Sequence, residues 1–276
     1  MSSFFEGRFI KANNYNNMNP PISRMGGKSK LRKEIISRLP EHTCYVETFF
    51  GAGWVYFGKE PSKVEVINDV EGELVNLFRM MKHHASELQR MLQYEFSSRD
   101  EFEYYKHADP KGLTEIQRAI RFIYINSQSF AAKGGNYGYG TSTKPRGIVF
   151  GERDLQQIQK RLRNTYVENL DFEELIRKYD RKGTMFFCDP PYYETAGYES
   201  EFSLKDQMRL VECLKRIKGK FLVTINDHPK VHEWYSWANI EEVHTVYSIS
   251  RDKDACGKVQ ELIITNYEPM QIKMLI

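Results

Sequence analysis

The stretch Met185-Phe186-Phe187-Cys188-Asp189-Pro190-Pro191-Tyr192 decides the fold, because it combines an apolar run with an abrupt polar end. Four consecutive apolar residues are typical of a buried strand. Proline has no backbone N–H to donate to a sheet, so the strand has to end at Asp189. Pro191 in turn favours an extended conformation for Pro190. The sequence therefore predicts a stiff loop that presents a carboxylate, two prolines and an aromatic ring at the carboxyl end of a strand.

Open α/β sheets bind their ligands at this edge. A carboxylate, a backbone carbonyl and an aromatic face can converge there on one planar ring that carries an amino group. These groups could together hold an exocyclic amine while a methyl group is transferred to it. The alternative is a strand terminator followed by an ordinary surface loop.

The composition is that of a globular protein. The chain has 276 residues, of which 41% are hydrophobic and 28% charged, enough for one large domain or one domain with an insertion. No apolar run approaches the roughly 20 residues that span a bilayer, and the N-terminus lacks the pattern of a signal peptide. The four cysteines have neither zinc spacing nor a disulfide framework. We therefore expect a cytoplasmic protein without a metal site, and the net charge of +3 does not decide whether it binds nucleic acid.

Apolar periodicity divides the chain into an α/β domain and an insertion. We expect a flexible arm at 1–20, a main domain at 21–73 and 165–276, and a mostly helical insertion at 74–164. The expected strands are 44–49, 64–69, 185–188, 221–225, 243–247 and 261–265. The expected helices include 31–39, 71–94 and 116–124. The strand, turn, helix and strand over 44–69 would form the first βαβ unit of a doubly wound sheet.

A second candidate site lies in the turn Phe49-Phe50-Gly51-Ala52-Gly53 of this unit. Gly51 and Gly53 permit positive φ and a close approach of the backbone to a ligand. Asp69 follows Glu47 by 22 residues, close to the offset of roughly 20 at which an acidic residue meets ribose hydroxyls. Because Glu47 disfavours a phosphate here, the pattern favours a cationic adenosine ligand, and S-adenosylmethionine is the obvious one. A plain turn followed by a helix cap is the alternative.

With the tetrad, these motifs resemble those of the amino-methylating DNA methyltransferases, and more narrowly the DNA adenine methylase family (D12 class, α group). The family's order is present: Arg24-Met25-Gly26-Gly27-Lys28, Glu47 to Gly53, Asn68-Asp69, an insertion, and Asp189 to Tyr192. The resemblance covers about residues 20 to 267. It implies a Rossmann-like class I methyltransferase sheet, doubly wound with an antiparallel last strand. The main domain would be catalytic, the insertion would be a target-recognition domain, and the enzyme is expected to be a monomer.

The resemblance also implies how S-adenosylmethionine is bound. Phe49, Gly51 and Gly53 would pack against its methionine part, and Asp69 would hold its ribose. Asp171-Phe172 resembles the segment that meets its adenine. This chain departs from the family at Arg24, where an aromatic residue is usual. The full set implied for the cofactor is Arg24, Met25, Lys28, Glu47, Phe49, Gly51, Gly53, Asp69, Asp171, Phe172 and Asp189.

The tetrad would bind the target base of double-stranded DNA through Asp189, Pro190, Pro191 and Tyr192. If Asp189 and the Pro190 carbonyl accept both hydrogens of the adenine N6 amine, its lone pair can face the methyl group in a direct transfer without a metal. The base has to leave the duplex, and Tyr192 offers it a stacking face. The glycine- and tyrosine-rich part of the insertion would contact DNA, with a disordered surface loop as the alternative. Its expected contacts are Lys133, Lys144 and Arg146 to phosphates, Tyr137 and Tyr139 as wedges, and Asn136.

Other functions stay open at this level. The same tetrad could serve the N4 amine of cytosine in DNA or an amine in RNA, whereas protein-glutamine enzymes of this superfamily typically begin the tetrad with Asn. A catalytically silent DNA-binding relative is disfavoured by the intact Glu47, Asp69 and Asp189. Trp54 and Tyr56 are expected in the core.

Overall fold

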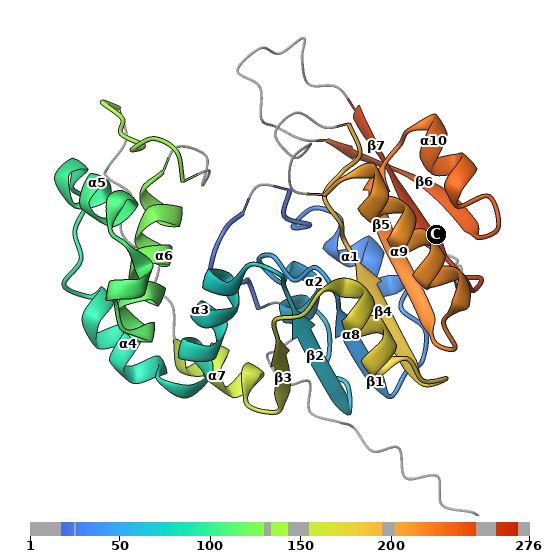
Figure 1. The fold of residues 1–276 in the computed structure, drawn as a ribbon, viewed down its shortest axis with the longest axis horizontal. Coiled ribbons are helices and arrows are strands. Elements are labelled where there is room, and N and C mark those ends of the chain that lie inside the picture. Colours follow the sequence, from blue (N-terminus) through green and yellow to red (C-terminus); the bar gives the residue numbers. More distant parts are fainter. Residues whose placement is uncertain are drawn as a thin grey trace, which may run out of the picture.

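The computed structural model describes residues 18–24, 26–129, 134–142, 155–194, 202–246 and 258–269. Within these ranges it forms a seven-stranded sheet of order β3-β2-β1-β4-β5-β7-β6 (Figure 1). The strands are β1 Cys44–Glu47, β2 Val64–Asn68, β3 Thr165–Glu168, β4 Thr184–Cys188, β5 Lys220–Asn226, β6 Asn239–Val246 and β7 Lys258–Thr265. β1 to β5 are parallel to one another, whereas β7 is antiparallel to β5 and β6. This topology confirms the expected doubly wound sheet with an antiparallel last strand.

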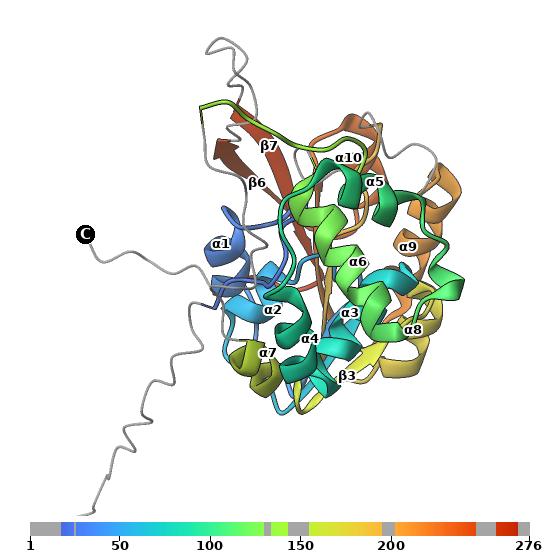
Figure 2. The ribbon, with the colours of Figure 1, turned by 90° about the vertical axis from the view of Figure 1, so that its left-hand side faces the viewer.

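Helices cover both faces of the sheet, as Figures 1 and 2 show. Successive side chains of a strand point to opposite faces, so each strand feeds two cores. In β4, Met185 and Phe187 belong to one core, whereas Phe186 belongs to the other. The first core also holds α1 and α2, and the second holds α8, α9 and α10. These helices are α1 Arg32–Ser37, α2 Trp54–Gly58, α8 Phe172–Tyr179, α9 Leu204–Arg216 and α10 Pro229–Trp234.

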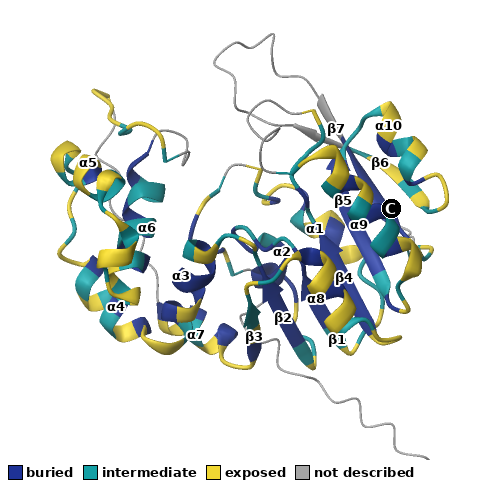
Figure 3. Ribbon diagram, viewed as in Figure 1, coloured by how far each residue is buried: buried dark blue, intermediate teal, exposed yellow. Residues whose placement is uncertain are grey.

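The insertion is helical and lies beside the β3 edge of the sheet (Figure 1). It shares a continuous core with the sheet, because Leu88, Phe102 and Tyr124 belong to the same buried cluster as Phe50 and Ile67. Figure 3 shows buried positions running from the sheet through α3 into this group of helices. The boundaries at 74 and 164 stay predictions. The helices are α3 Gly72–His83, α4 Ala85–Leu92, α5 Arg99–His107, α6 Glu115–Gln128 and α7 Leu155–Leu162, with a 3₁₀ turn at Pro110–Gly112.

Three expectations about the elements need correction. The sequence does not predict β3, because this edge strand has only four residues and exposes 60% of Tyr166, so it lacks an apolar run. The helix expected over 71–94 is interrupted at His84, whose φ of −132° and ψ of 32° are not helical. The strand expected at 44–49 ends at Glu47. In the part of the chain that the structure describes, no helix combines the length and apolarity needed to cross a membrane.

A buried group of charges joins the insertion to the sheet. The Lys59 ammonium lies 2.7 Å from Glu65 Oε1, and the Arg161 guanidinium donates to both oxygens of the same carboxylate. All three residues are at most 5% exposed. The Arg161 guanidinium also lies 3.7 Å from the centroid of the Tyr56 ring, and Tyr56 is fully buried as expected. Since Arg161 belongs to α7 and Glu65 to β2, this group fixes where the chain returns from the insertion.

We expect the change Glu65→Ala to lower the free energy of unfolding by about 3–5 kcal/mol, because it leaves two buried cations without their anion. Urea denaturation at neutral pH measures this. Glu87→Ala is the matched control, since Glu87 pairs with Arg90 on the exposed surface of α4. A loss below about 1 kcal/mol, the value of an ordinary surface pair, would show that the group does not bind the insertion to the sheet.

Candidate active site

A cavity of about 510 Å³ opens at the carboxyl edge of β1, β2 and β4. Parallel strands place their carboxyl ends at one edge, so the loops that follow them meet there. The structure brings almost the whole predicted cofactor and base site together around this cavity. The predicted residues that line it are Arg24, Lys28, Glu47, Phe49, Gly51, Gly53, Asp69, Asp171, Phe172, Asp189, Pro190, Pro191 and Tyr192. Met25 lies outside the described residues.

Asp189 and Lys28 form an ion pair in the wall of the cavity. Lys28 Nζ lies 2.7 Å from Asp189 Oδ1, and the two side chains are 4% and 19% exposed. The Thr224 hydroxyl donates to the same oxygen at 2.9 Å. Burial raises the pKa of Asp189, while the charge and hydrogen bond of Lys28 act to lower it. Among the described residues both contacts are therefore made to Oδ1, and Oδ2 is the oxygen left for a ligand.

The glycine turn requires both of its glycines. Gly51 has a φ of 52° and Gly53 a φ of 78°, in the left-handed region that other residues rarely adopt. A Cβ at Gly53 would come within 2.4 Å of the Phe50 ring, whereas one at Gly51 would meet open space. Asp69 holds the turn, because its carboxylate accepts the amide hydrogen bonds of Gly51 at 2.9 Å and Glu71 at 3.0 Å. A carboxylate has about four acceptor sites, so Asp69 keeps capacity for a ligand hydroxyl.

Glu47 is a buried carboxyl group in the cavity wall. It is 2% exposed, and Oε2 accepts a hydrogen bond of 2.8 Å from the Tyr45 hydroxyl. Burial raises the pKa of Glu47 to about 8, and the negative charge of Asp189 adds to this rise. A cationic ligand in the cavity would favour the ionised form of Glu47, and the ionised carboxylate would in turn attract the cation.

Aromatic rings form the side of the cavity next to α8. The Phe49 ring lies 5.8 Å from that of Phe172 and 5.6 Å from that of Phe202, and the latter two are 5.6 Å apart. Asp171 caps α8 and pairs with Arg209 at 2.8 Å, and the Arg209 guanidinium lies 4.7 Å from the Phe172 ring centroid. This apolar wall with a carboxylate at its rim suits the flat, amino-bearing ring of an adenine.

Arg24 lies at the other rim of the cavity. Its guanidinium pairs with Glu71 at 2.5 Å and lies 6.0 Å from the Phe122 ring centroid. Trp54 was expected in the core, and it packs against the core but also lines the cavity. A Cβ at Gly27 would come within 2.7 Å of Trp54 Nε1, so glycine is needed for the approach of the indole.

Several lining or contacting residues are not predicted by the sequence: Trp54, Phe202, Asp206 and Thr224. Thr224 is typical. It lies inside an expected strand, and only the pairing of β4 with β5, which sets Cys188 opposite Val223, brings its hydroxyl level with Asp189. The pattern of the sequence contains no signal for that register.

The predicted DNA-contacting segment is described only in part. Lys133, Lys144 and Arg146 lie outside the described residues, and Asn136 is exposed. Tyr139 is 74% exposed. Tyr137 is only partly exposed, and its ring packs 5.7 Å from that of Phe102 in the core.

The guanidinium of Arg99, the first residue of α5, lies 5.1 Å from the Tyr137 ring and 5.0 Å from the Tyr139 ring. Arg99 therefore links the two tyrosines. This contact crosses from the helical part of the insertion to its irregular segment, and the sequence does not predict it.

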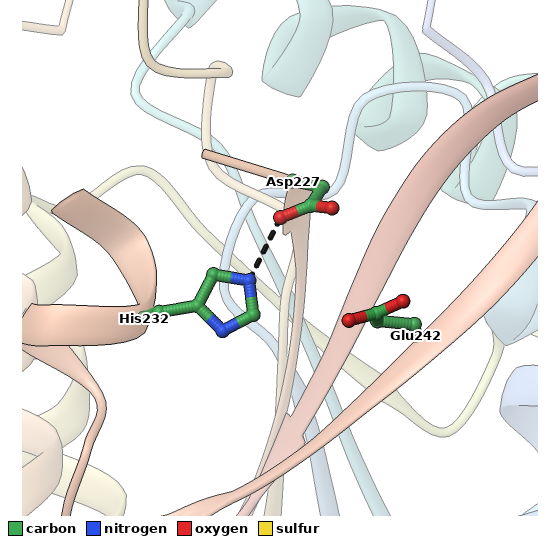
Figure 4. Close-up of side chains that lie close together, drawn as sticks. All are labelled: Asp227, His232 and Glu242. Carbon is green, nitrogen blue, oxygen red and sulfur yellow. Dashed lines mark hydrogen bonds and ion pairs between the residues drawn. The ribbon is translucent and has the colours of Figure 1, made fainter. Parts of the chain in front are cut away.

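Elsewhere, Asp227, His232 and Glu242 place their donor atoms within 4.8 Å of one another (Figure 4). His232 Nε2 and Asp227 Oδ1 are 2.8 Å apart, which fastens α10 to the end of β5. Glu242 is exposed. The setting is that of a surface ion pair, and it lies outside the cavity lining.

Comparison with known proteins identifies the family. The family of D12 class N6 adenine-specific DNA methyltransferases matches residues 25–249. The chain belongs to this family. The D12 methyltransferase therefore transfers a methyl group from S-adenosylmethionine to the N6 amine of adenine in DNA.

Several curated proteins resemble this D12 methyltransferase over most of their length. Type II methyltransferase M1.LlaDCHI of Lactococcus lactis subsp. cremoris is 29% identical, over 91% of this chain and 96% of its own. The DNA adenine methylases of Serratia marcescens and Escherichia coli K12 are 26% and 25% identical, over 86% and 88% of this chain and 94% and 93% of their own. A solved putative RNA methyltransferase from Pyrococcus horikoshii is 9% identical with a TM-score of 0.42, over 92% and 91% of the two chains.

We expect the stability of the methyltransferase to fall as pH rises from about 4.5 to about 8, because native Glu47 keeps its proton over this window whereas unfolded Glu47 loses it. The slope from Glu47 is at most about 1.4 kcal/mol per pH unit. Glu47→Gln should remove this part of the slope. Urea unfolding of both proteins at several pH values measures it, and equal slopes would contradict the assignment.

Proposed function

We propose that the cavity binds S-adenosylmethionine beside an adenine flipped out of the duplex, and that the tetrad activates the adenine amine for direct transfer. One observation carries this proposal. The tetrad that follows β4 and the glycine turn that follows β1 line the same cavity, so acceptors for an amine and a turn suited to the cofactor meet in one space.

The residues of the cavity fit the cofactor in charge and shape. The cofactor carries a cationic sulfonium and an ammonium group, and Glu47, Asp69 and Asp189 are among the carboxylates of the lining. Phe49 and Phe172 provide an apolar wall for its adenine. Asp69 is the residue we assign to the ribose hydroxyls, because the Gly51 and Glu71 amides hold its carboxylate in place. When bound, the cofactor supplies an electrophilic methyl group.

Asp189 prepares the nucleophile. The exocyclic amine of adenine is weakly nucleophilic because its lone pair is delocalised into the ring. Asp189 Oδ2 and the Pro190 carbonyl can accept its two hydrogens, which draws the nitrogen toward tetrahedral geometry. The Pro191 carbonyl already accepts a hydrogen bond of 2.8 Å from Gln207, so Pro190 is the better candidate. Acceptors placed in advance stabilise the positive charge that develops on nitrogen.

Lys28 and burial act in opposite directions on the pKa of Asp189. Lys28 stabilises the carboxylate needed as an acceptor. Burial raises the pKa of Asp189, which makes it a better acceptor for the proton that the methylated amine has to lose. The proposed transfer needs no metal, since both acceptors come from the tetrad.

We assign the wedge into the duplex to Tyr139 rather than to Tyr137. Tyr139 is 74% exposed, whereas the Tyr137 ring packs on Phe102. Tyr137 then supports Arg99, which in turn contacts the Tyr139 ring. The phosphate contacts of Lys133, Lys144 and Arg146 stay predictions. A monomer acting on DNA in the cytoplasm is the simplest state consistent with this proposal.

Asp189→Ala should lower kcat by a factor of about 100–1,000, since it removes an acceptor aimed at developing charge. It should also lower the melting temperature, because it leaves the buried Lys28 ammonium without its anion. The assay is transfer of labelled methyl groups to duplex DNA, with the product nucleoside identified by mass spectrometry. Asp227→Asn is the control, a carboxylate at the end of β5 outside the cavity lining. Label on N4 of cytosine or on RNA, or a variant with more than a tenth of wild-type turnover, would overturn the proposal.

Tyr139→Ala should impair base flipping, and a mismatch at the target adenine should partly restore it because the pairing is already broken. Tyr137→Ala should instead lower the melting temperature, because its ring packs in the core. Fluorescence of 2-aminopurine at the target position reports flipping, and Tyr166→Ala on β3 serves as an exposed-tyrosine control. Normal flipping by Tyr139→Ala would place the wedge elsewhere.

A further inference from the structure

Polar side chains from two elements, α9 and β5, hold the backbone of the tetrad loop. Gln207 of α9 is 1% exposed and donates from Nε2 to the Pro191 carbonyl at 2.8 Å. Asn226, the last residue of β5, accepts from the Tyr193 amide and donates to the Tyr193 carbonyl, both at 3.0 Å. The backbone on both sides of Tyr192 is therefore fixed.

The side chain of Tyr192 is fixed from a third element, β7. Its hydroxyl donates to Glu261 Oε2 at 2.6 Å, and Glu261 is fully buried. Glu261 lies opposite Asn226 in the antiparallel pairing of β5 with β7. Because β7 runs against β5, its first half lies at the carboxyl edge of the sheet, where the cavity opens. The loop that leaves β4 thus passes over the end of β5 and is anchored on the next strand.

This anchor determines the orientation of an aromatic ring. A tyrosine ring on a fixed backbone still rotates about two side-chain bonds. A hydrogen bond at the hydroxyl fixes the first rotation, and it limits the second because a phenolic O–H prefers the plane of its ring. Lys28 Nζ, which pairs with Asp189, also lies 4.8 Å from the Tyr192 ring centroid. Ring, carboxylate and ammonium therefore form one connected arrangement. A buried carboxylate is costly unless it is hydrogen-bonded, so its presence on β7 calls for a role.

We propose that Glu261 is a positioning residue for methyl transfer, which holds the Tyr192 ring in the plane that receives the flipped base. This rests on the proposed function, in which Tyr192 stacks on that base. Glu261 does not touch the base in this role and acts only through Tyr192. Its negative charge also acts to raise the pKa of Asp189, so an electrostatic role is the alternative that a test has to separate.

Four variants separate the two roles: Tyr192→Phe, Glu261→Gln, Glu261→Ala, and Tyr192→Phe combined with Glu261→Ala. Tyr192→Phe removes the hydrogen bond and keeps the charge. Glu261→Gln keeps an acceptor and removes the charge. The readouts are kcat on duplex DNA, cofactor affinity by calorimetry, and melting temperature. Tyr179→Phe is the matched control, because Tyr179 donates the same kind of bond to Glu168 at 2.5 Å outside the cavity lining.

If Glu261 positions the ring, Tyr192→Phe should lower kcat by a factor of about 10–100 with cofactor affinity within about twofold. Glu261→Ala should lower kcat by the same factor as Tyr192→Phe, and the double variant should have a kcat little lower than either single variant. Glu261→Gln should recover most of the turnover that is lost in Glu261→Ala. Tyr179→Phe should leave kcat unchanged. If Glu261→Ala fails to fold, the turnover of Tyr192→Phe and of Glu261→Gln still distinguishes the positioning role from the electrostatic role.

Two results would overturn the proposal. One is a Tyr192→Phe variant with turnover within about twofold of the wild type, which would show that the bond to Glu261 is not needed. The other is a Glu261→Gln variant as poor as Glu261→Ala, which would show that an acceptor at this position is not enough and that the charge of Glu261 is needed. A wild type that binds duplex and cofactor yet methylates no adenine overturns the proposed function, and the positioning role with it.

Discussion

The ion pair between Lys28 and Asp189 connects the parts of the site. Its 2.7 Å contact joins the segment before α1 to the loop after β4, two regions far apart in the sequence. A buried charge requires a partner, so neither residue can take another position without leaving the other unpaired. Thr224 adds a hydrogen bond from β5, and Lys28 also faces the Tyr192 ring. Asp189, the proposed amine acceptor, is therefore held in one place next to a positive charge.

The carboxyl edge of the sheet contains buried carboxyl groups that lower the stability of the protein. Glu47 and Glu261 are buried carboxyl groups close to Asp189, and such groups lower stability unless they are protonated, paired or hydrogen-bonded. Each has a tyrosine hydroxyl as a donor, from Tyr45 and Tyr192 respectively. Functional sites commonly retain such costly arrangements, with the surrounding packing making up the difference. Here the two aromatic-rich cores on either side of the sheet provide that packing.

The insertion is coupled to the catalytic part through packing and charge. Its helices share a core with α1 and α2, and Arg161 of α7 pairs with Glu65 of β2 inside the protein. These contacts fix the position of the helices of the insertion against the sheet. The exposed Tyr139 is linked to this core, because Arg99 contacts both its ring and the Tyr137 ring, which packs against Phe102.

The sequence by itself determined the class of sheet, the place of the tetrad and four acidic residues of the cavity, Glu47, Asp69, Asp171 and Asp189. Prolines end strands wherever they occur, apolar runs favour buried strands, and glycines at 51 and 53 permit the observed positive φ. These constraints act on a few neighbouring residues, so a short stretch of sequence is enough to predict them. The tertiary structure alone decided the partners of Asp189 and Tyr192. Thr224 and Glu261 are ordinary strand residues in sequence, and their roles arise from the register of β5 with β4 and of β7 with β5. Register results from the packing of whole strands and layers, so no short stretch of sequence specifies which side chains it brings together.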